Sequence, residues 1–289
     1  MRLPAAIGFC VLLISTAYAE SPQQQLKTAL HGKTVFIRGF YQDDRLEYTA
    51  QGEVMGTPQP GSWTVAQMQV NRVAVRQDRF EVSGPRVITY VDHATGEFRT
   101  LKPSRKHTIR ITLHVLPATL NQKQLGALIQ KVFVTEAKPD ISVFPPYWRE
   151  FLSGNMIRSS DKDGKPAFKR QDETIADAGE EDRPVHSDSS GEPVFHVSER
   201  IEAPKVQYQI DPEYSESARA QKFSGRTVVS LEVDRSGAVH DIQIVQPVGY
   251  GLDDQAVRAV QQWRFSPARR NGEPVAVLLE AEVSFSVSP

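Results

Sequence analysis

The sequence has little cysteine and no apolar stretch long enough to cross a membrane. Its 289 residues include one cysteine, Cys10, which excludes a disulfide scaffold and a metal site built from several thiolates. The formal net charge of −1 argues against a protein that coats nucleic acid or an anionic membrane. An apolar fraction of 39% is enough for real cores, so disorder over the full length is excluded as well.

The first 19 residues have the features of a secretory signal peptide. Arg2 precedes an apolar run over residues 7–16, and Ala17, Tyr18 and Ala19 form an A-x-A cleavage site before Glu20. This run is shorter than the roughly 20 residues that span a bilayer. We therefore expect residues 1–19 to be a cleaved signal peptide and the mature chain to be exported without any cysteine. The alternative is an uncleaved segment that anchors the chain in a membrane.

Charge divides the rest of the chain into three parts. Residues 20–158 carry 18 Lys and Arg against 12 Asp and Glu, residues 159–202 carry 6 against 12, and residues 203–289 carry 9 against 11. The middle part also loses its apolar periodicity, so it buries too little surface to offset its ordering entropy. The pattern predicts an N-terminal domain over 20–158, an acidic flexible linker over 159–202 and a C-terminal domain over 203–289.

The predicted N-terminal domain is rich in strand-forming residues. In the segment HTIRITLHV, the apolar side chains from Ile109 to Val115 alternate with polar ones, which is typical of a strand with one buried face. Residues 120–132 have helical spacing instead, with apolar side chains at Leu125, Leu128, Ile129 and Val132. We expect an antiparallel sheet covered by one or two helices, and the motifs of this part indicate no known family.

A basic cluster lies beside a predicted turn of this domain. It consists of Arg99, Lys102, Arg105, Lys106, His107 and Arg110. One interpretation is a binding patch for phosphate, lipid headgroups or an acidic partner, such as the acidic linker itself. The other is a solvated hairpin tip with long cationic side chains. Because Phe98 is the only aromatic residue nearby, single-stranded nucleic acid is not an expected ligand.

The sequence contains no catalytic motif. It lacks G-x-S-x-G, H-E-x-x-H and a phosphate-binding glycine loop. The seven histidines are scattered, and the D-K-D-G segment at Asp161 has its glycine at the wrong position for a calcium loop. We therefore expect no enzyme activity, no metal and no small-molecule cofactor.

The C-terminal domain has the clearest pattern. It predicts a short helix over 215–223, a hairpin of two alternating strands around Ser236 and Gly237, a helix from Leu252 to Trp263 and a long final strand after Asn271 and Gly272. In the final strand, alternate apolar residues from Val275 to Phe285 share one face. Three strands and two helices make a small α+β module.

These residues resemble the C-terminal domain of the TonB energy-transducer family. The segments PEYSESARAQKFSGRTVVSLEVDRSGAVHDIQIV and GLDDQAVRAVQQWRFSPARRNGEPV carry the resemblance, which covers roughly residues 203–289. Ser215 stands where the family often has a second proline, which affects only the start of the first helix. The resemblance implies the order helix, strand, strand, helix, strand, and so predicts an α+β fold for the chain.

The resemblance also implies a partner. Domains of this family bind an extended segment at the N-terminus of an outer-membrane transporter, which adds as a strand beside the last strand of the sheet. The expected partner-binding edge is then formed by Val275, Ala276, Val277, Leu278, Leu279, Glu280, Ala281, Glu282 and Val283. Two alternatives for this strand are completion of the domain's own sheet and pairing with a second copy in a homodimer.

Two functions follow from these patterns. The first is a TonB-like periplasmic protein of outer-membrane transport. Full transducers of the family have an N-terminal membrane helix and a long proline-rich linker. Here we expect a cleaved N-terminus and a short acidic linker, so we do not expect this chain alone to couple transport to the proton-motive force; an N-terminus that stays uncleaved in the inner membrane would favour transduction. The second is a soluble periplasmic adaptor, which uses the same module to bind another envelope protein or polymer without energy transduction.

Overall fold

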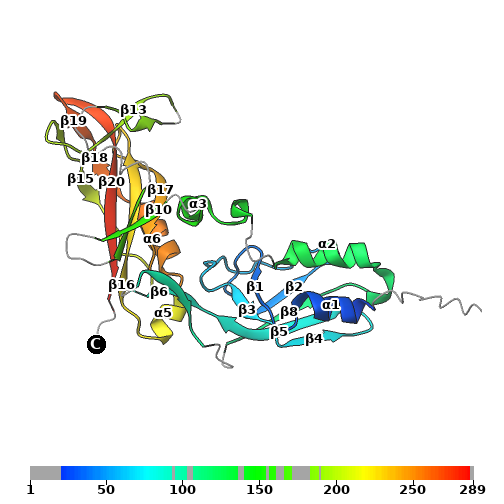
Figure 1. Ribbon diagram of the computed structural model, residues 1–289. Helices are drawn as coiled ribbons and strands as arrows, with labels where there is room; N and C mark the ends of the chain where they lie inside the picture. Colours follow the sequence, from blue (N-terminus) through cyan, green and yellow to red (C-terminus); the bar gives the residue numbers. More distant parts are fainter. Residues whose placement is uncertain are drawn as a thin grey trace, which may run out of the picture.

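The computed structural model describes residues 21–92, 95–102, 107–135, 140–153, 156–160, 166–170, 183–188 and 190–286. The expected signal peptide lies outside these residues. The fold is α+β, with many strands and few helices. Figure 1 shows two sheets at the two ends of a bent molecule, with the short helix α3 (Pro146–Leu152) between them.

The N-terminal sheet has the strand order β2-β8-β5-β3-β1-β9, with β4 paired to β5. Its strands are β1 (Thr34–Ile37), β2 (Arg45–Tyr48), β3 (Gln67–Gln69), β4 (Arg72–Val75), β5 (Phe80–Val87), β8 (Thr108–Leu113) and β9 (Phe133–Val134). The alternation predicted around Ile109 is confirmed, because Ile109, Ile111 and Leu113 are fully buried. The sheet is not purely antiparallel as expected, since β2 pairs with β8 in parallel.

Two helices pack on the core of this sheet. Helix α2 (Gln122–Val132) begins with a capping box between Asn121 and Gln124, and its buried side chains are those that the spacing predicted. Helix α1 (Pro22–Leu30) begins at the N-cap Ser21 and buries Leu26 and Leu30 in the same core. The expected helix over 120–132 is therefore confirmed with a later start.

The C-terminal sheet is built around one long strand. Its strand order is β12-β13-β20-β16-β17, and β19 pairs with both β14 and β20. The bounds are β12 (His186–Ser187), β13 (Pro193–His196), β14 (Ile201–Glu202), β16 (Gly225–Val233), β17 (Val239–Gln246), β19 (Ala268–Arg270) and β20 (Glu273–Phe285). A separate ribbon joins β15 (Lys205–Tyr208) to β18 (Arg264–Ser266).

The elements predicted for residues 215–285 are all present. Helix α5 (Glu216–Ala220) starts at Ser215, whose hydroxyl accepts from the Ala218 amide, and helix α6 (Leu252–Val260) follows β17. Asn271 and Gly272 both have positive φ, as a tight hairpin turn requires. The face predicted for β20 is confirmed, because Val275, Val277, Val283 and Phe285 lie in the core.

Described strands interrupt the flexible acidic linker expected over 159–202. Residues 166–170 form β11 (Pro166–Arg170), which pairs with β10 (Met156–Ser160). Strands β12, β13 and β14 also fall within the expected linker, and β13 and β14 pair with the C-terminal sheet. Residues 171–182, the most acidic stretch, lie outside the described residues.

One hydrophobic core joins the two halves of the chain. It contains Trp63, Phe144 and Trp148 from the N-terminal half together with side chains of β16, β17, β20 and α6. Helix α3 packs against β17, and the rings of Trp63 and Trp148 meet edge to face at 5.2 Å. The C-terminal sheet therefore packs directly against the N-terminal half.

A backbone contact strengthens this junction. Strand β6 (Thr89–Asp92), paired with β7 (Glu97–Thr100), leaves the N-terminal sheet after β5 and reaches the loop before α6 (Figure 1). Its Thr89 carbonyl accepts from the Tyr250 amide at 2.9 Å, and its Val91 amide donates to the Val248 carbonyl at 3.1 Å. The loop thus pairs with β6 much as a short strand would.

None of the helices formed by the described residues is long and apolar enough to span a bilayer.

Candidate partner-binding edge

The candidate site is the side of β20 that faces away from β16. On its inner side, β20 pairs with β16 in antiparallel register from Val277 to Phe285. On its outer side, the strand order places β13, which pairs in parallel through Val194, Phe195 and His196. Beyond this contact, no described strand pairs with the outer side of β20 from Ala281 to Phe285. An unpaired strand edge is a template for a further strand.

The predicted edge is therefore divided into a covered part and an open part. Val275 pairs with Ala268 of β19, and residues 276–278 pair with β13. The expectation of an open edge along all of 275–283 is wrong for these four residues, because the chain's own strands complete the sheet there. For Leu279, Glu280, Ala281, Glu282 and Val283, partner binding stays a prediction.

Side chains of β20 alternate between two environments. The odd-numbered residues from Val275 to Phe285 face the core. On the opposite face, Ala276 and Leu278 form a small apolar cluster with Val194, while Glu282 and Ser284 are exposed. A strand added beside residues 281–285 would thus meet polar side chains on one face and the margin of the core on the other.

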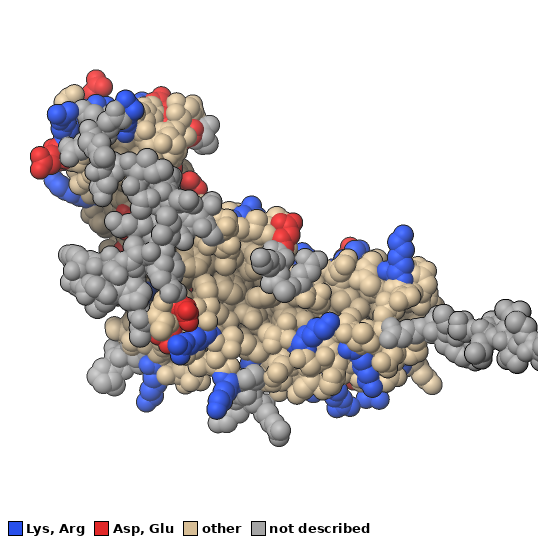
Figure 2. All heavy atoms as spheres, in the orientation of Figure 1, with Lys and Arg blue, Asp and Glu red and all other residues tan. Residues whose placement is uncertain are grey.

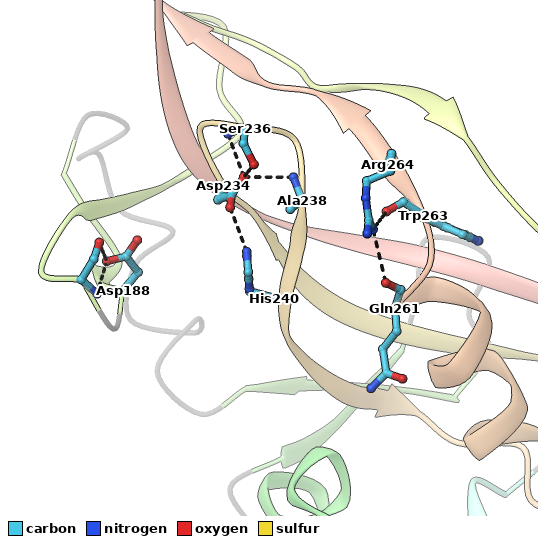
Figure 3. Close-up of polar contacts among 9 residues, drawn as sticks. Asp188, Asp234, Ser236, Ala238, His240, Gln261, Trp263 and Arg264 are labelled. Atoms are coloured by element: carbon cyan, nitrogen blue, oxygen red, sulfur yellow. Dashed lines mark hydrogen bonds and ion pairs between the residues drawn. The ribbon is translucent and has the colours of Figure 1, made fainter.

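The turns of two hairpins share one hydrogen-bond pattern, shown in part in Figure 3. In the β16–β17 turn, Asp234 Oδ1 accepts from the Ser236 amide at 2.8 Å, the Ser236 hydroxyl at 2.6 Å and the Ala238 amide at 2.9 Å. In the β12–β13 turn, Asp188 Oδ1 accepts from the corresponding groups of Ser190 and Glu192 at 2.8, 2.6 and 2.9 Å. Both segments read D-x-S-G, which favours a side-chain-stabilised turn.

These hydrogen bonds change the acidity of both carboxyl groups. Burial acts to raise the pKa of Asp234, but the hydrogen bonds from Ser236, Ala238 and His240 outweigh it and lower the pKa to about 2. The Ser190 hydroxyl and the Glu192 amide likewise lower the pKa of Asp188. Each carboxylate is therefore ionised at neutral pH and fixes its turn.

We expect Asp188→Ala to loosen β13 without unfolding the domain. The substitution removes three hydrogen bonds in one turn, worth about 1 kcal/mol each at an exposed site, so amides of Val194 and His196 should exchange about tenfold faster or more. Hydrogen exchange followed by mass spectrometry measures this. Asp140→Ala is the matched control, because it removes the hydrogen bonds that Asp140 accepts from the Ser142 amide and hydroxyl at another exposed turn, in the N-terminal half, and should leave exchange at β13 unchanged. Equal exchange at β13 in the two variants would contradict the claim that the Asp188 turn holds β13 in place.

The side chain of Arg264 caps the C-terminal end of α6 by binding backbone carbonyls there (Figure 3). Arg264 Nη1 donates to the Trp263 carbonyl at 2.7 Å and lies 3.4 Å from the Gln261 carbonyl. The Trp263 indole donates to the Ile210 carbonyl at 3.2 Å, the partner that a buried indole needs. These contacts fix the chain between α6 and β18.

Two buried aspartates, Asp253 and Asp254, lie in the first turn of α6, close to the junction with the N-terminal half. Asp253 accepts from the Val248 and Gly249 amides, both at 2.7 Å, and from the Thr227 hydroxyl. Asp254 accepts from the Tyr147 hydroxyl of α3 at 2.8 Å. Burial raises the pKa of Asp253 to about 7 and also raises the pKa of Asp254. The two carboxyl groups therefore hold the loop and α3 against the helix.

The predicted basic cluster is only partly described. Arg99 lies on β7 and forms an ion pair with Asp92 at 3.1 Å, and Arg110 lies on β8 opposite Arg45. Lys102 is exposed, and Arg105 and Lys106 lie outside the described residues. On the face shown in Figure 2, Lys and Arg side chains lie at several places on the N-terminal half, and some of them lie close together along its lower margin. A binding role for this cluster stays a prediction.

Within the described residues, no group of three or more His, Cys, Asp or Glu side chains is placed to hold a metal ion.

Sequence reasoning missed the strand that covers part of the edge. The signal was present, because the segment from Val185 to Val197 reads VHSDSSGEPVFHV, with a D-x-S-G turn between two short runs that contain apolar residues. Its acidic surroundings favoured a linker instead. The α3 helix was missed as well, although Pro146 stands at its first turn.

Comparisons with known proteins agree on the C-terminal part of the chain. Residues 210–287 match the family described as Gram-negative bacterial TonB protein C-terminal. Protein TonB of Vibrio cholerae serotype O1 is 30% identical over 83 residues. Residues 210–287 form a TonB C-terminal domain. The similarity to the Vibrio protein covers 28% of this chain and 34% of the relative, so this chain spans about a third of the relative's length.

A solved structure is similar to the same part. The solution structure of the Pseudomonas aeruginosa TonB C-terminal domain is 26% identical and covers 32% of this chain and 91% of that domain, with a TM-score of 0.27. The residues matched by the family, 210–287, take up under a third of the chain.

Proposed function

We propose that this chain is a TonB-like, non-enzymatic protein of the periplasm that takes part in outer-membrane transport. It binds an extended segment of an outer-membrane transporter by strand addition to β20. The observation that carries this proposal is the outer side of β20 at Ala281–Phe285, which no described strand covers, within a matched TonB domain. Backbone hydrogen bonds along that side would supply affinity, and flanking side chains would tune the choice of partner.

Site-specific cross-linking tests this proposal. Ser284→Cys places one thiol on an exposed position of β20, and Gln207→Cys places the control thiol on exposed β15. Both variants are made in the chain from residue 21 onward, which contains no other cysteine. Synthetic peptides covering the N-terminal segments of the source organism's outer-membrane transporters each carry one cysteine.

We expect a disulfide between a transporter peptide and Cys at position 284 but not at position 207. Cross-linking at both positions, or at neither, would contradict strand addition at this edge. Cross-linking of two protein chains through position 284 without peptide would instead favour the homodimer. Hydrogen exchange provides a second readout, because a bound strand should slow exchange at Ala281–Phe285.

A second candidate function is an adaptor that binds another envelope protein or polymer without energy transduction. The observation that favours it is the shared core, in which Trp148 and Phe144 fix a second sheet against the TonB domain. Cell fractionation separates the two. A mature chain that starts at Glu20 in the soluble periplasmic fraction favours the adaptor, and an uncleaved chain in the inner membrane favours transduction.

A further inference from the structure

Part of the proposed partner site is occupied by the chain itself. Strand β13 runs parallel to β20, with Val194 opposite Ala276, Phe195 opposite Val277 and His196 opposite Leu278. This is the same outer side of β20 to which a partner strand would add. The resident hairpin, defined as Val185–His196 with strands β12 and β13, is therefore an intramolecular version of strand addition.

Side chains hold the resident hairpin on both faces of the sheet. Val194 is fully buried against Ala276 and Leu278, with Val185 packed beside them. On the other face, Phe195 is buried in the shared core. The Arg270 guanidinium lies 4.9 Å from the centre of the Phe195 ring, within range of a cation–π contact.

Two polar contacts, a His186–Glu232 hydrogen bond and a Glu192–Arg235 ion pair, link the same hairpin to the end of β16 and the turn after it. His186 Nε2 lies 2.5 Å from Glu232 Oε1, and Glu192 lies 2.6 Å from Arg235. The Glu192 and Arg235 side chains are about half exposed, at 45% and 49%. Exposed pairs of this kind add little stability and are screened by salt. The Glu192–Arg235 pair therefore adds little to the stability of the docked hairpin.

The pairing of β13 with β20 is short compared with the other strand pairing of β20. Strand β13 pairs with β20 through three residues, whereas β16 pairs along Gly225–Val233. Four residues, 197–200, connect β13 to β14, which is paired separately with β19. The hairpin can therefore leave β20 while β14 keeps its place, and its tether keeps it at a high effective concentration for return.

We propose that the resident hairpin is an internal competitor for the partner site on β20. A partner strand that extends past Ala281 toward Ala276 must displace β13, so the fraction of molecules with β13 detached sets the apparent affinity. The inference rests on the proposed function, since it concerns the same edge. It also indicates the partner's chemistry: a segment parallel to β20, with a small apolar residue at the Val194 position followed by an aromatic one.

Variants that open or lock β13 test the competition. Val194→Asp puts a charge into the apolar cluster with Ala276 and Leu278 and should detach β13. Val194→Cys combined with Ala276→Cys locks β13 when oxidised, because directly paired residues in adjacent strands lie within disulfide range. The reduced form of the same protein is its control. His186→Ala with Glu192→Ala removes both polar contacts while keeping Val194 and Phe195, and serves if Val194→Asp does not fold.

Two probes are used with the full chain from residue 21. One is a transporter peptide that covers the residues cross-linked at position 284, and the other is a peptide of this chain's residues 192–197. We expect Val194→Asp to bind both at least tenfold more tightly than the unmodified protein. The double alanine variant should bind them a few-fold more tightly, and oxidation of the cysteine pair should weaken binding at least tenfold relative to the reduced form.

The outcomes separate this inference from the proposed function. Equal affinity of the transporter peptide for open, unmodified and locked proteins would overturn the competition and leave strand addition intact. Binding of peptide 192–197 to the open variant, with no transporter peptide bound by any form, would support the internal competitor and overturn the proposed partner. Failure of peptide 192–197 to bind a variant whose β13 amides exchange freely would overturn the inference.

Discussion

Gly249→Ala should destabilise the protein by about 3–5 kcal/mol and detach the N-terminal half from the TonB domain. Gly249 has φ +86°, and a Cβ there would lie 2.4 Å from Tyr90 Cα and 2.6 Å from the Thr89 carbonyl oxygen. Both neighbours are backbone atoms of β6, so the overlap is relieved only if the loop and β6 move apart. That movement also breaks the hydrogen bond from the Tyr250 amide to Thr89.

Gly272→Ala is the matched control. Gly272 has φ +85°, nearly the same backbone conformation, but a Cβ there meets nothing within 4 Å. Alanine at this position should therefore cost only the strain of the left-handed conformation, about 1–2 kcal/mol. Urea unfolding of both variants measures the difference, and limited proteolysis between β6 and α3 reports detachment. An equal loss in the free energy of unfolding for the two variants would show that the close contact between Gly249 and β6 does not contribute to stability.

The junction fixes how β20 is oriented relative to the N-terminal half, but it does not form the proposed partner site. The Trp148 and Tyr147 side chains of α3 and the backbone of β6 meet the TonB domain at α6, β17 and the loop between them. None of these contacts lies on the outer side of β20. We therefore expect Gly249→Ala to retain peptide cross-linking at position 284 if the TonB domain stays folded.

Local pattern predicted the TonB domain well and the junction poorly. Val229, Leu231 and Val233 alternate with polar residues along a strand, and the helix around Val257 has a clear apolar stripe, so short-range periodicity determines these elements. Nothing local marks Trp148 as part of a core shared with a domain 60 residues or more away in the sequence. That contact follows from tertiary packing.

The candidate site shows the same division. The residues of β20 were predicted from their alternation and from the family resemblance, and their core-facing set is confirmed. Coverage by β13 was not predicted, because its short strand lies in an acidic segment and owes its place to Ala276 and Leu278, some 80 residues later in the chain. A strand that depends on such a long-range partner has little local signature.

The second large effect expected is on pH dependence, through the buried Asp253. Its pKa is raised to about 7 because burial outweighs the hydrogen bonds from Thr227, Val248 and Gly249, whereas in the unfolded chain it is about 3.9. Between these values the folded state holds a proton that the unfolded state has released. The free energy of unfolding should therefore fall as pH rises from about 4 to about 7, by about 4 kcal/mol from this group. Asp254 acts in the same direction, since burial raises its pKa too.

Asp253→Asn should flatten this part of the stability profile, because the amide does not titrate. The variant should also be less stable at pH 4, since one side of the amide presents N–H groups toward the Gly249 amide, which donates to Asp253 Oδ2 at 2.7 Å. Urea unfolding between pH 4 and pH 8 separates the two effects. Loss of the titrating group changes the slope of the free energy of unfolding against pH, whereas the unfavourable amide contact lowers that free energy by the same amount at every pH. Asp241→Asn removes an exposed carboxylate and should leave the slope unchanged. An unaltered slope in Asp253→Asn would mean that Asp253 is ionised throughout this range and that its three donors outweigh burial.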